Sequence, residues 1–379
     1  MTAFTFQTAP NILFEAGAAR KIAGLVAEFS ARRVMLVTDR GVRAAGLTAA
    51  AEAGMRAAGM SVAVFEEVVA DPPASVIEAA AEMCRAQKIE AVVAIGGGSA
   101  MDTAKLAAYL AKTPERLEDI YGIGLARGVR LPLLLAPTTA GTGSEVTPIS
   151  IVTTPSHEKK GVVSPRLLPD WAVLDLELTL GLPPAATAAT GIDAMVHAVE
   201  AYTSRHRKNP LSDQLARQAL TLLARSIRTA CRDGRDLAAR GDMLLGSMLA
   251  GMAFANAPVA AVHALAYPVG ALFHVPHGLS NALVLGPVLR FNMAAAAALY
   301  AELAPLVDPD GVHGGDFPAS LDAIARDCGV PASLAAVGIG PGHLPKLAQD
   351  AMKQTRLLGN NPREMTYEDA LAIYAQALG

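Results

Sequence analysis

The stretch VVAIGGGSAMDTAK, residues 92–105, decides the fold of the first half of the chain. An apolar run leads into three glycines and Ser99, and a helix-forming segment follows. Glycines let the backbone approach a ligand closely, and the unpaired N–H groups at the start of a helix suit a pyrophosphate. The spacing is not GxGxxG, so a plain tight turn is the alternative interpretation.

The segments on both sides of this stretch repeat the alternation of apolar runs and helical segments. Short, continuously apolar strands between helices predict a parallel sheet that is covered on both faces. We therefore expect a doubly wound, Rossmann-like α/β domain over residues 1–182. Its strands are expected at 33–39, 61–68, 90–99, 131–139 and 149–154, with helices at 74–87 and near 101–112.

From about Pro183 onward the strand signals end, and long Ala- and Leu-rich segments predict an all-α domain over residues 183–379. Two prolines and a glycine at 176–187 are typical of a hinge. The tetrapeptide TYED (366–369) predicts a capping box at the start of the last helix. The other helices are expected at about 185–202, 212–231, 236–255, 260–272, 294–306 and 317–328.

The composition excludes several classes of protein. The formal net charge of −3 gives no electrostatic reason to expect nucleic acid or an anionic membrane as a partner. Three widely spaced cysteines without a CxxC favour a reducing compartment. The N-terminus lacks a signal-peptide pattern, and the longest apolar stretch, 247–266, is interrupted by polar residues and Pro258. We expect a cytoplasmic protein.

A second loop, APTTAGTGSEVT (136–147), also follows a strand. Its hydroxyls and bare amides suit phosphates, ribose and a nicotinamide carboxamide. Asp39 ends an earlier strand, where a carboxylate can accept hydrogen bonds from a ribose 2′-OH and repel a 2′-phosphate. That position favours NAD over NADP, although an Asp at a turn beside Arg40 is the plainer alternative.

Two segments gather a carboxylate and several histidines. In GIDAMVHAVEAY (191–202), Asp193 and His197 are four residues apart and face the same side of a helix. The segment 262–281 adds His263, His274 and His277. A carboxylate with two or three imidazoles is a ligand set that divalent transition metals prefer. Spacing does not decide between His274 and His277, and we interpret Glu200 as supporting the ligands or lying at the surface.

These strings together resemble the iron-containing (group III) alcohol dehydrogenase family. GGGSAMDTAK, PTTAGTGSEVT, GIDAMVHAVEAY and VHALAYPVGALFHVPHG occur in that order over nearly the whole chain. The resemblance implies an N-terminal domain that binds a nicotinamide dinucleotide and a dehydroquinate synthase-like helical domain that binds Fe²⁺ or Zn²⁺. It also implies a homodimer or a larger homo-oligomer, often with a shared N-terminal strand. The implied metal ligands are Asp193, His197, His263 and His277.

The resemblance implies cofactor contacts as well, with Lys159 preferred to Lys160. The implied cofactor-binding residues are Asp39, Asp71, Gly97, Gly98, Ser99, Asp102, Thr138, Thr139, Thr142, Ser144 and Lys159. Where many members of the family have a second histidine in HAMAHP, this chain has Tyr267. A tyrosine, with an ordinary pKa of ~10, is a poor base at neutral pH. The expected proton route therefore involves bound water, ribose hydroxyls, His274 or Tyr267.

We expect a reversible alcohol–carbonyl oxidoreduction in which a metal acts as a Lewis acid and the nicotinamide exchanges hydride. The substrate class is a small alcohol and its aldehyde or ketone. A maleylacetate reductase-like enzyme and a hydroxyacid–oxoacid transhydrogenase of the same fold are the alternatives. The complete set of one Asp and three His argues against the metal-free reductase.

Overall fold

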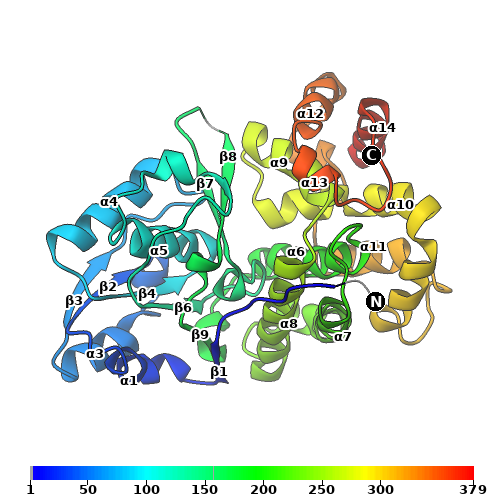
Figure 1. Cartoon of the computed structure of the whole chain (residues 1–379). Coiled ribbons are helices and arrows are strands. Elements are labelled where there is room, and N and C mark those ends of the chain that lie inside the picture. Colours follow the sequence, from blue (N-terminus) through cyan, green and yellow to red (C-terminus); the bar gives the residue numbers. More distant parts are fainter. Residues whose placement is uncertain (1–2, 157) are drawn as a thin grey trace. The chain divides into compact units, whose positions relative to one another are not determined.

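The computed structural model describes residues 3–156 and 158–379. The described chain forms two compact units (Figure 1). One comprises Gln7–Gly181, and the other comprises Leu182–Gly379 together with residues 3–6.

The first unit is built on a six-stranded parallel sheet with the order β1-β9-β6-β4-β2-β3. The central strand β4 is buried along its whole length, as expected for a strand covered on both faces. The doubly wound α/β fold is therefore confirmed. The strands are β1 (Asn11–Glu15), β2 (Arg33–Val37), β3 (Ser61–Phe65), β4 (Ala91–Gly96), β6 (Leu133–Pro137) and β9 (Trp171–Asp175).

Helices cover both faces of the sheet (Figure 1). Neighbouring residues of β2 pack in two different hydrophobic clusters. Leu36 of β2 packs in a cluster with residues of α1 (Ile22–Ala27) and α3 (Ala49–Ala57). Its neighbour Met35 packs in a cluster with residues of α4 (Ala74–Ala86) and α5 (Gly98–Leu110). This two-residue alternation gives the sheet a hydrophobic core on both faces.

The order of the strands reverses at β2. From β2 the chain goes to β3 on one side and then returns to β4 on the other side. In open parallel sheets, ligands bind at such a reversal, outside the carboxyl ends of the strands. The short helix α2 (Arg40–Ala44) follows β2 there, and α5 follows β4.

One predicted strand lies in a different sheet. Residues 149–154 form β7 (Ile149–Thr153), which pairs antiparallel with β8 (Lys159–Val163). β8 also pairs with β5 (Gly122–Ile123) to complete a three-stranded sheet. The expectation that 149–154 belongs to the parallel sheet was wrong, because β7 alternates between buried and half-buried residues and has only one fully covered face.

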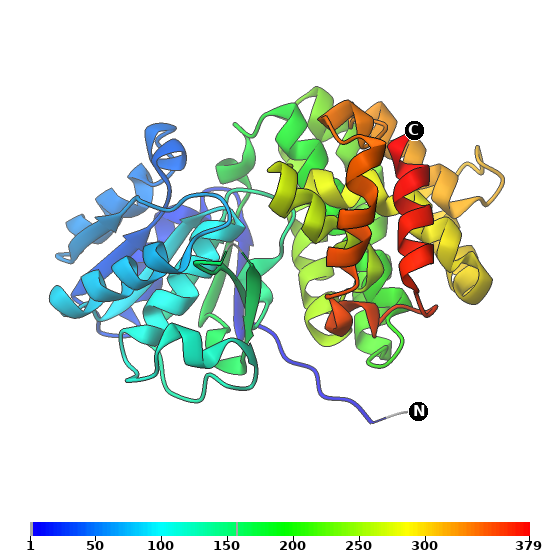
Figure 2. The ribbon, with the colours of Figure 1, turned by 90° about the horizontal axis from the view of Figure 1, so that it is seen from above.

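Helices are the only regular secondary structure among the described residues of the second unit. Helices α6, α7 and α8 pack against one another, and α10 packs against α6, α9, α11 and α14. Figure 2 shows α12 and α14 near the C-terminus as neighbours. The helices are α6 (Pro184–Thr203), α7 (Pro210–Arg232), α8 (Leu237–Asn256), α9 (Ala261–Phe273), α10 (His277–Val307), α11 (Phe317–Asp327), α12 (Leu344–Ala351), α13 (Thr355–Leu358) and α14 (Tyr367–Leu378).

Local sequence signals explain several helix ends. Thr366 and Asp369 form the predicted capping box of α14. The stretch 247–266 is broken between α8 and α9, which bend by 107° at that point. Helix α10 is long and apolar enough to cross a membrane by length and composition alone. It also packs against α6, α7, α9, α11 and α14, as a core helix of a folded domain does.

Candidate active site

Helix α6 presents Asp193 and His197 to the interior of the helical unit. Their side chains are almost fully buried, with 2% and 4% of each residue exposed. The His197 ring stacks on Phe254 of α8 at 4.3 Å and on His263 of α9 at 4.8 Å, measured between ring centroids. The spacing of four residues thus places both groups among aromatic rings of other helices.

His263 and His277 approach Asp193 from the first turns of α9 and α10. The Oδ1 atom of Asp193 lies 4.0 Å from Nε2 of His263 and 3.7 Å from Nε2 of His277. One ligand atom from each of these three residues lies within 4.8 Å of the others. The structure therefore brings His277, rather than His274, to the carboxylate.

The two residues considered for proton transfer lie in different surroundings. The Tyr267 ring is 5.9 Å from the His277 ring and 6.4 Å from the His263 ring. His274 is an exposed residue that ends α9 in the left-handed conformation, with φ of 55°. Tyr267 therefore belongs to the histidine cluster, and His274 faces solvent.

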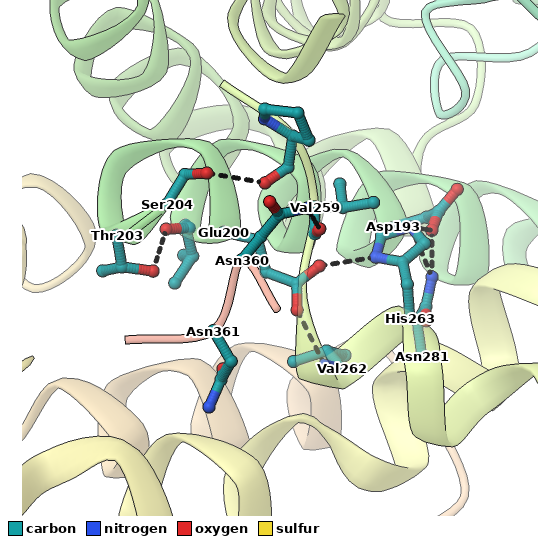
Figure 3. Close-up of polar contacts among 12 residues, drawn as sticks. Asp193, Glu200, Thr203, Ser204, Val259, Val262, His263, Asn281, Asn360 and Asn361 are labelled. Carbon is teal, nitrogen blue, oxygen red and sulfur yellow. Dashed lines mark hydrogen bonds and ion pairs between the residues drawn. The ribbon is translucent and has the colours of Figure 1, made fainter. Parts of the chain in front are cut away.

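Two further residues, Glu200 and Asn281, join the cluster (Figure 3). The sequence left Glu200 either supporting the ligands or at the surface, and it did not single out Asn281. The Nδ2 group of Asn281 donates to Asp193 Oδ1 at 2.6 Å and lies 3.3 Å from Nε2 of both His263 and His277. Glu200 is buried, and its Oε2 lies 2.6 Å from Nδ1 of His263. The four-residue spacing of His277 and Asn281 on α10, and the seven-residue spacing of Asp193 and Glu200 on α6, are the signals that could have found them.

The environment of Asp193 suits a cation. Burial raises the pKa of its carboxyl, but His197, His277, His263 and the Asn281 amide together hold that pKa below its usual value. No Lys or Arg among the described residues forms an ion pair with this carboxylate. The buried Oδ1 atom of Asn281 also has no hydrogen-bond partner within the described chain. A buried set of one carboxylate and imidazole nitrogens, lacking a basic side chain, fits Fe²⁺ or Zn²⁺.

In the first unit, the candidate nucleotide loops lie at the reversal of strand order. Asp39 follows β2 and caps α2, because its Oδ1 accepts from the Val42 N–H at 2.9 Å. Gly97 precedes α5, and a side chain on Gly98 would come within 2.8 Å of Thr142. The two glycine-containing loops therefore touch, and the close approach explains why residue 98 has no side chain.

The hydroxyl-rich loop runs from β6 to β7 and contains the other predicted contacts. Thr138 is buried and its N–H donates to the Gly96 carbonyl at 3.0 Å, which ties this loop to the end of β4. Thr139 is half-buried and would lie 3.7 Å from a Cβ atom on Gly97. Both threonines thus border the start of α5.

Asp102 and Ser144 belong to a buried network that locks this loop onto α5. Ser144 donates to Asp102 at 2.7 Å, and the Lys105 ammonium donates to Ser144 at 2.7 Å. Burial raises the pKa of Asp102 and lowers the pKa of Lys105 to about 8. The adjacent Glu145 is also buried, and burial raises its pKa to about 7. Lys105 also donates to the Ile149 carbonyl at 2.7 Å, and Asp102 accepts from the Ile151 N–H at 2.8 Å, so the network supports the shape of the loop.

Asp71, Ser99 and Lys159 form a second group in this unit. The backbone N–H of Asp71 donates to Ser99 Oγ at 3.2 Å, and Lys159 Nζ donates to Asp71 Oδ1 at 2.7 Å. Lys160 instead lies 3.9 Å from Glu158. Of the two lysines, Lys159 is therefore the one connected, through Asp71, to Ser99 at the start of α5.

Comparisons with known proteins agree with this architecture. Residues 9–176 match the model of the iron-containing alcohol dehydrogenases, and residues 187–378 match that of the C-terminal part of the Fe-containing alcohol dehydrogenase family. Long-chain-alcohol dehydrogenase 1 of Geobacillus thermodenitrificans (strain NG80-2) is 40% identical over 370 residues, which cover 95% of this chain and 93% of the relative.

Two solved structures are similar over their whole length. A crystal structure of 1,3-propanediol oxidoreductase has a TM-score of 0.96 and 33% identity, and the match covers 100% of both chains. Sulfoacetaldehyde reductase from Bifidobacterium kashiwanohense, in complex with NAD⁺, has a TM-score of 0.89 and 28% identity, covering 100% of this chain and 99% of that chain. Fold, histidine cluster and sequence agree: the chain belongs to the iron-containing alcohol dehydrogenase family.

Proposed function

We propose that this alcohol dehydrogenase interconverts a small alcohol and its aldehyde or ketone, using NAD(H) and one divalent metal ion. The observation that carries the proposal is the cluster of buried Asp193, buried His263 and half-buried His277, whose ligand atoms lie within 4.8 Å of one another. No Lys or Arg among the described residues pairs with the Asp193 carboxylate, and a divalent cation would supply the missing positive charge.

The proposed ligands are Asp193, His197, His263 and His277, and Fe²⁺ or Zn²⁺ is the proposed ion. A cation held there would supply Lewis acidity to a substrate oxygen. The chain's own part is to hold the ligand atoms in place and to exclude water, for which the stacked rings of His197, His263 and Phe254 are suited.

The proposed cofactor is NAD rather than NADP. The glycine-rich start of α5 suits the pyrophosphate, since its unpaired N–H groups are accessible without side chains. Asp39 follows β2 at the reversal of strand order, where its carboxylate would accept from a ribose 2′-OH and repel a 2′-phosphate. The neighbouring Arg40 guanidinium pairs with Glu67 at 2.7 Å, which reduces its ability to attract a 2′-phosphate.

Tyr267 is the proposed side-chain member of the proton route. It lies next to His263 and His277, whereas His274 is exposed at the end of α9. Because a tyrosine hydroxyl is a weak base at neutral pH, its proposed part is to donate a hydrogen bond and to order water beside the substrate.

We also propose that the enzyme is a cytoplasmic homodimer or a larger homo-oligomer without nucleic-acid or membrane partners. The small net charge of −3 supports the lack of nucleic-acid and membrane partners, and the absence of a CxxC supports a reducing compartment. The proposed oligomer rests on the membership of the iron-containing alcohol dehydrogenase family.

Replacing Asp193 by Ala tests the proposed function. Asp193→Ala removes the only carboxylate among the four proposed ligands, so we expect metal to be lost and turnover to fall by about 10³-fold or more. NAD binding should remain, because the proposed cofactor residues belong to the other unit. Elemental analysis of anaerobically purified protein, NADH absorbance with a panel of short alcohols and aldehydes, and titration with NAD measure the three quantities.

Asp327→Ala is a matched control. Asp327 is half-exposed at the end of α11, where it pairs with Arg228, and it should leave metal content and turnover unchanged. Full activity of Asp193→Ala in the absence of metal would refute the proposed function.

A further inference from the structure

The buried side chains around His263 specify on which ring nitrogen its proton resides. The imidazole of His263 and the carboxylate of Glu200 meet at Nδ1 and Oε2, 2.6 Å apart, and both residues are almost fully buried. On the opposite side of the ring, Nε2 lies 3.3 Å from Nδ2 of Asn281 (Figure 3). A neutral imidazole has one N–H donor and one acceptor nitrogen, so these two neighbours select between two tautomers.

Glu200 selects the tautomer with the proton on Nδ1. A carboxylate oxygen only accepts hydrogen bonds, so the nitrogen 2.6 Å away must carry hydrogen. The other oxygen of Glu200 accepts from the backbone N–H of Val262 at 2.7 Å, in the first turn of α9. That N–H has no partner within the helix, so both oxygens of Glu200 are engaged as acceptors.

Asn281 selects the same tautomer from the other side. Its Nδ2 group carries only donors, so the facing Nε2 atom of His263 must present a lone pair. With the proton on Nε2 instead, two donors would face each other there, and the lone pair of Nδ1 would face a carboxylate oxygen. The nitrogen that faces Asp193 and His277 is therefore the one with the lone pair.

We propose that Glu200 and Asn281 are positioning residues that hold His263 in the Nδ1–H tautomer, so that its Nε2 lone pair is directed at the metal centre before any cation binds. This inference rests on the proposed metal function and extends it to residues outside the ligand set. Carboxylates that accept from the second nitrogen of a metal-binding histidine fix the ring and strengthen its bond to the metal.

Glu200→Gln is the sharpest substitution, because it keeps size and shape but leaves one acceptor where two are needed. If the Gln oxygen faces the Val262 N–H, the NH₂ group faces Nδ1 of His263 and favours the wrong tautomer. If the amide is reversed, the Val262 N–H faces another donor in a buried site. In one orientation the Nε2 lone pair of His263 is lost, and in the other the hydrogen bond to the Val262 N–H is lost. We therefore expect binding of Co²⁺ to weaken by about 10- to 100-fold.

The experiment titrates metal-free wild-type protein, Glu200→Gln and Glu52→Gln with Co²⁺ in competition with a chelator. Glu52 is a matched control, since it is also a buried carboxylate that accepts hydrogen bonds, but it lies on α3 of the other unit. Glu52→Gln should bind Co²⁺ as the wild type does. A folded Glu200→Gln protein with wild-type affinity would overturn the proposal.

A second measurement needs no variant. In metal-free wild-type protein at about pH 8, above the ordinary imidazole pKa of ~6.5, ¹⁵N NMR of labelled histidines reports the tautomer directly. We expect the proton of His263 on Nδ1, and a proton on Nε2 would overturn the proposal. Failure of wild-type protein to bind Co²⁺ would instead overturn the proposed metal centre, while the NMR result still decides the tautomer.

Discussion

At the scale of single residues, two buried acids differ in how their charge is compensated. Asp193 lies among three imidazoles and the Asn281 amide, which together hold the pKa of its carboxyl down despite burial. Glu145 has no comparable set of partners, and its buried Oε1 has no hydrogen-bond partner among the described residues. Burial raises the pKa of Glu145 to about 7. The surroundings of Asp193 favour its charged form, whereas those of Glu145 favour its protonated, neutral form.

Glu145 therefore makes stability depend on pH. Its pKa is 4.5 when unperturbed and about 7 in the folded chain. Between these values the folded state binds a proton that the unfolded state has released, so wild-type stability should fall as pH rises through this window. Glu145→Gln removes this titration, so its stability relative to the wild type should rise across the window by at most about 3 kcal/mol.

Urea unfolding of both proteins at several pH values between these two pKa values measures the difference. A difference that stays constant over the window, or that falls as pH rises, would contradict a raised pKa at Glu145. We expect the pH effect on the unfolding of the first unit, because Glu145 lies within Gln7–Gly181.

At the scale of elements, the contact between α6 and α10 sets the distance between two proposed ligands. Gly278 follows His277, and a Cβ atom on it would lie 2.3 Å from the carbonyl oxygen of Ala189, one turn before Asp193. Backbone cannot yield at that distance, so a side chain would push the start of α10 away from α6. The glycine in the PHG string thus has a steric role in the site.

Gly278→Ala should destabilise the protein by about 1–3 kcal/mol and weaken metal binding, because it moves His277 away from Asp193. Gly191→Ala is the comparison on α6, where the added Cβ would meet the flexible ends of Met243 and Ile227 instead of backbone. We expect it to lose less metal affinity than Gly278→Ala. Urea unfolding and Co²⁺ titration measure both effects, and a Gly278→Ala protein with wild-type affinity would contradict the steric account.

Periodicity predicted most helices, but it failed where the sequence is interrupted. Helix α10 was expected at 294–306, but it begins at His277. The prediction missed its first half because Gly286 and Pro287 interrupt the apolar pattern there. Strands β1 and β9 were not predicted; β1 is largely exposed and lacks a continuous apolar run. Residues 149–154 form a strand as expected, but the prediction that it joins the parallel sheet was wrong. The pairing partner of a strand is set by tertiary contacts, which the local sequence does not report.

The candidate site shows the same limit. Spacing along one helix predicted that Asp193 and His197 share a face, because only local geometry is needed. The approach of His263 and His277 to Asp193 depends on how α9 and α10 pack on α6, and sequence spacing left His274 and His277 undecided. Glu200 and Asn281 share helix faces with Asp193 and His277, but their hydrogen-bond partners His263 and Asp193 are 63 and 88 positions away, so spacing along one helix does not identify these partners.

At the scale of the whole molecule, each unit holds one part of the proposed chemistry. The unit Gln7–Gly181 contains the candidate nucleotide loops at the carboxyl ends of a parallel sheet. The helical unit contains the candidate metal ligands, drawn from α6, α9 and α10. The two family models match residues 9–176 and 187–378, one in each unit.

Anomalous X-ray diffraction from crystals of anaerobically purified protein, collected at the absorption edges of iron and zinc, tests the metal centre most directly. We predict one strong peak within bonding distance of Asp193, His197, His263 and His277. A metal bound elsewhere in the chain would contradict the proposed metal centre. Four side chains that point in unrelated directions, with no peak between them, would contradict it as well.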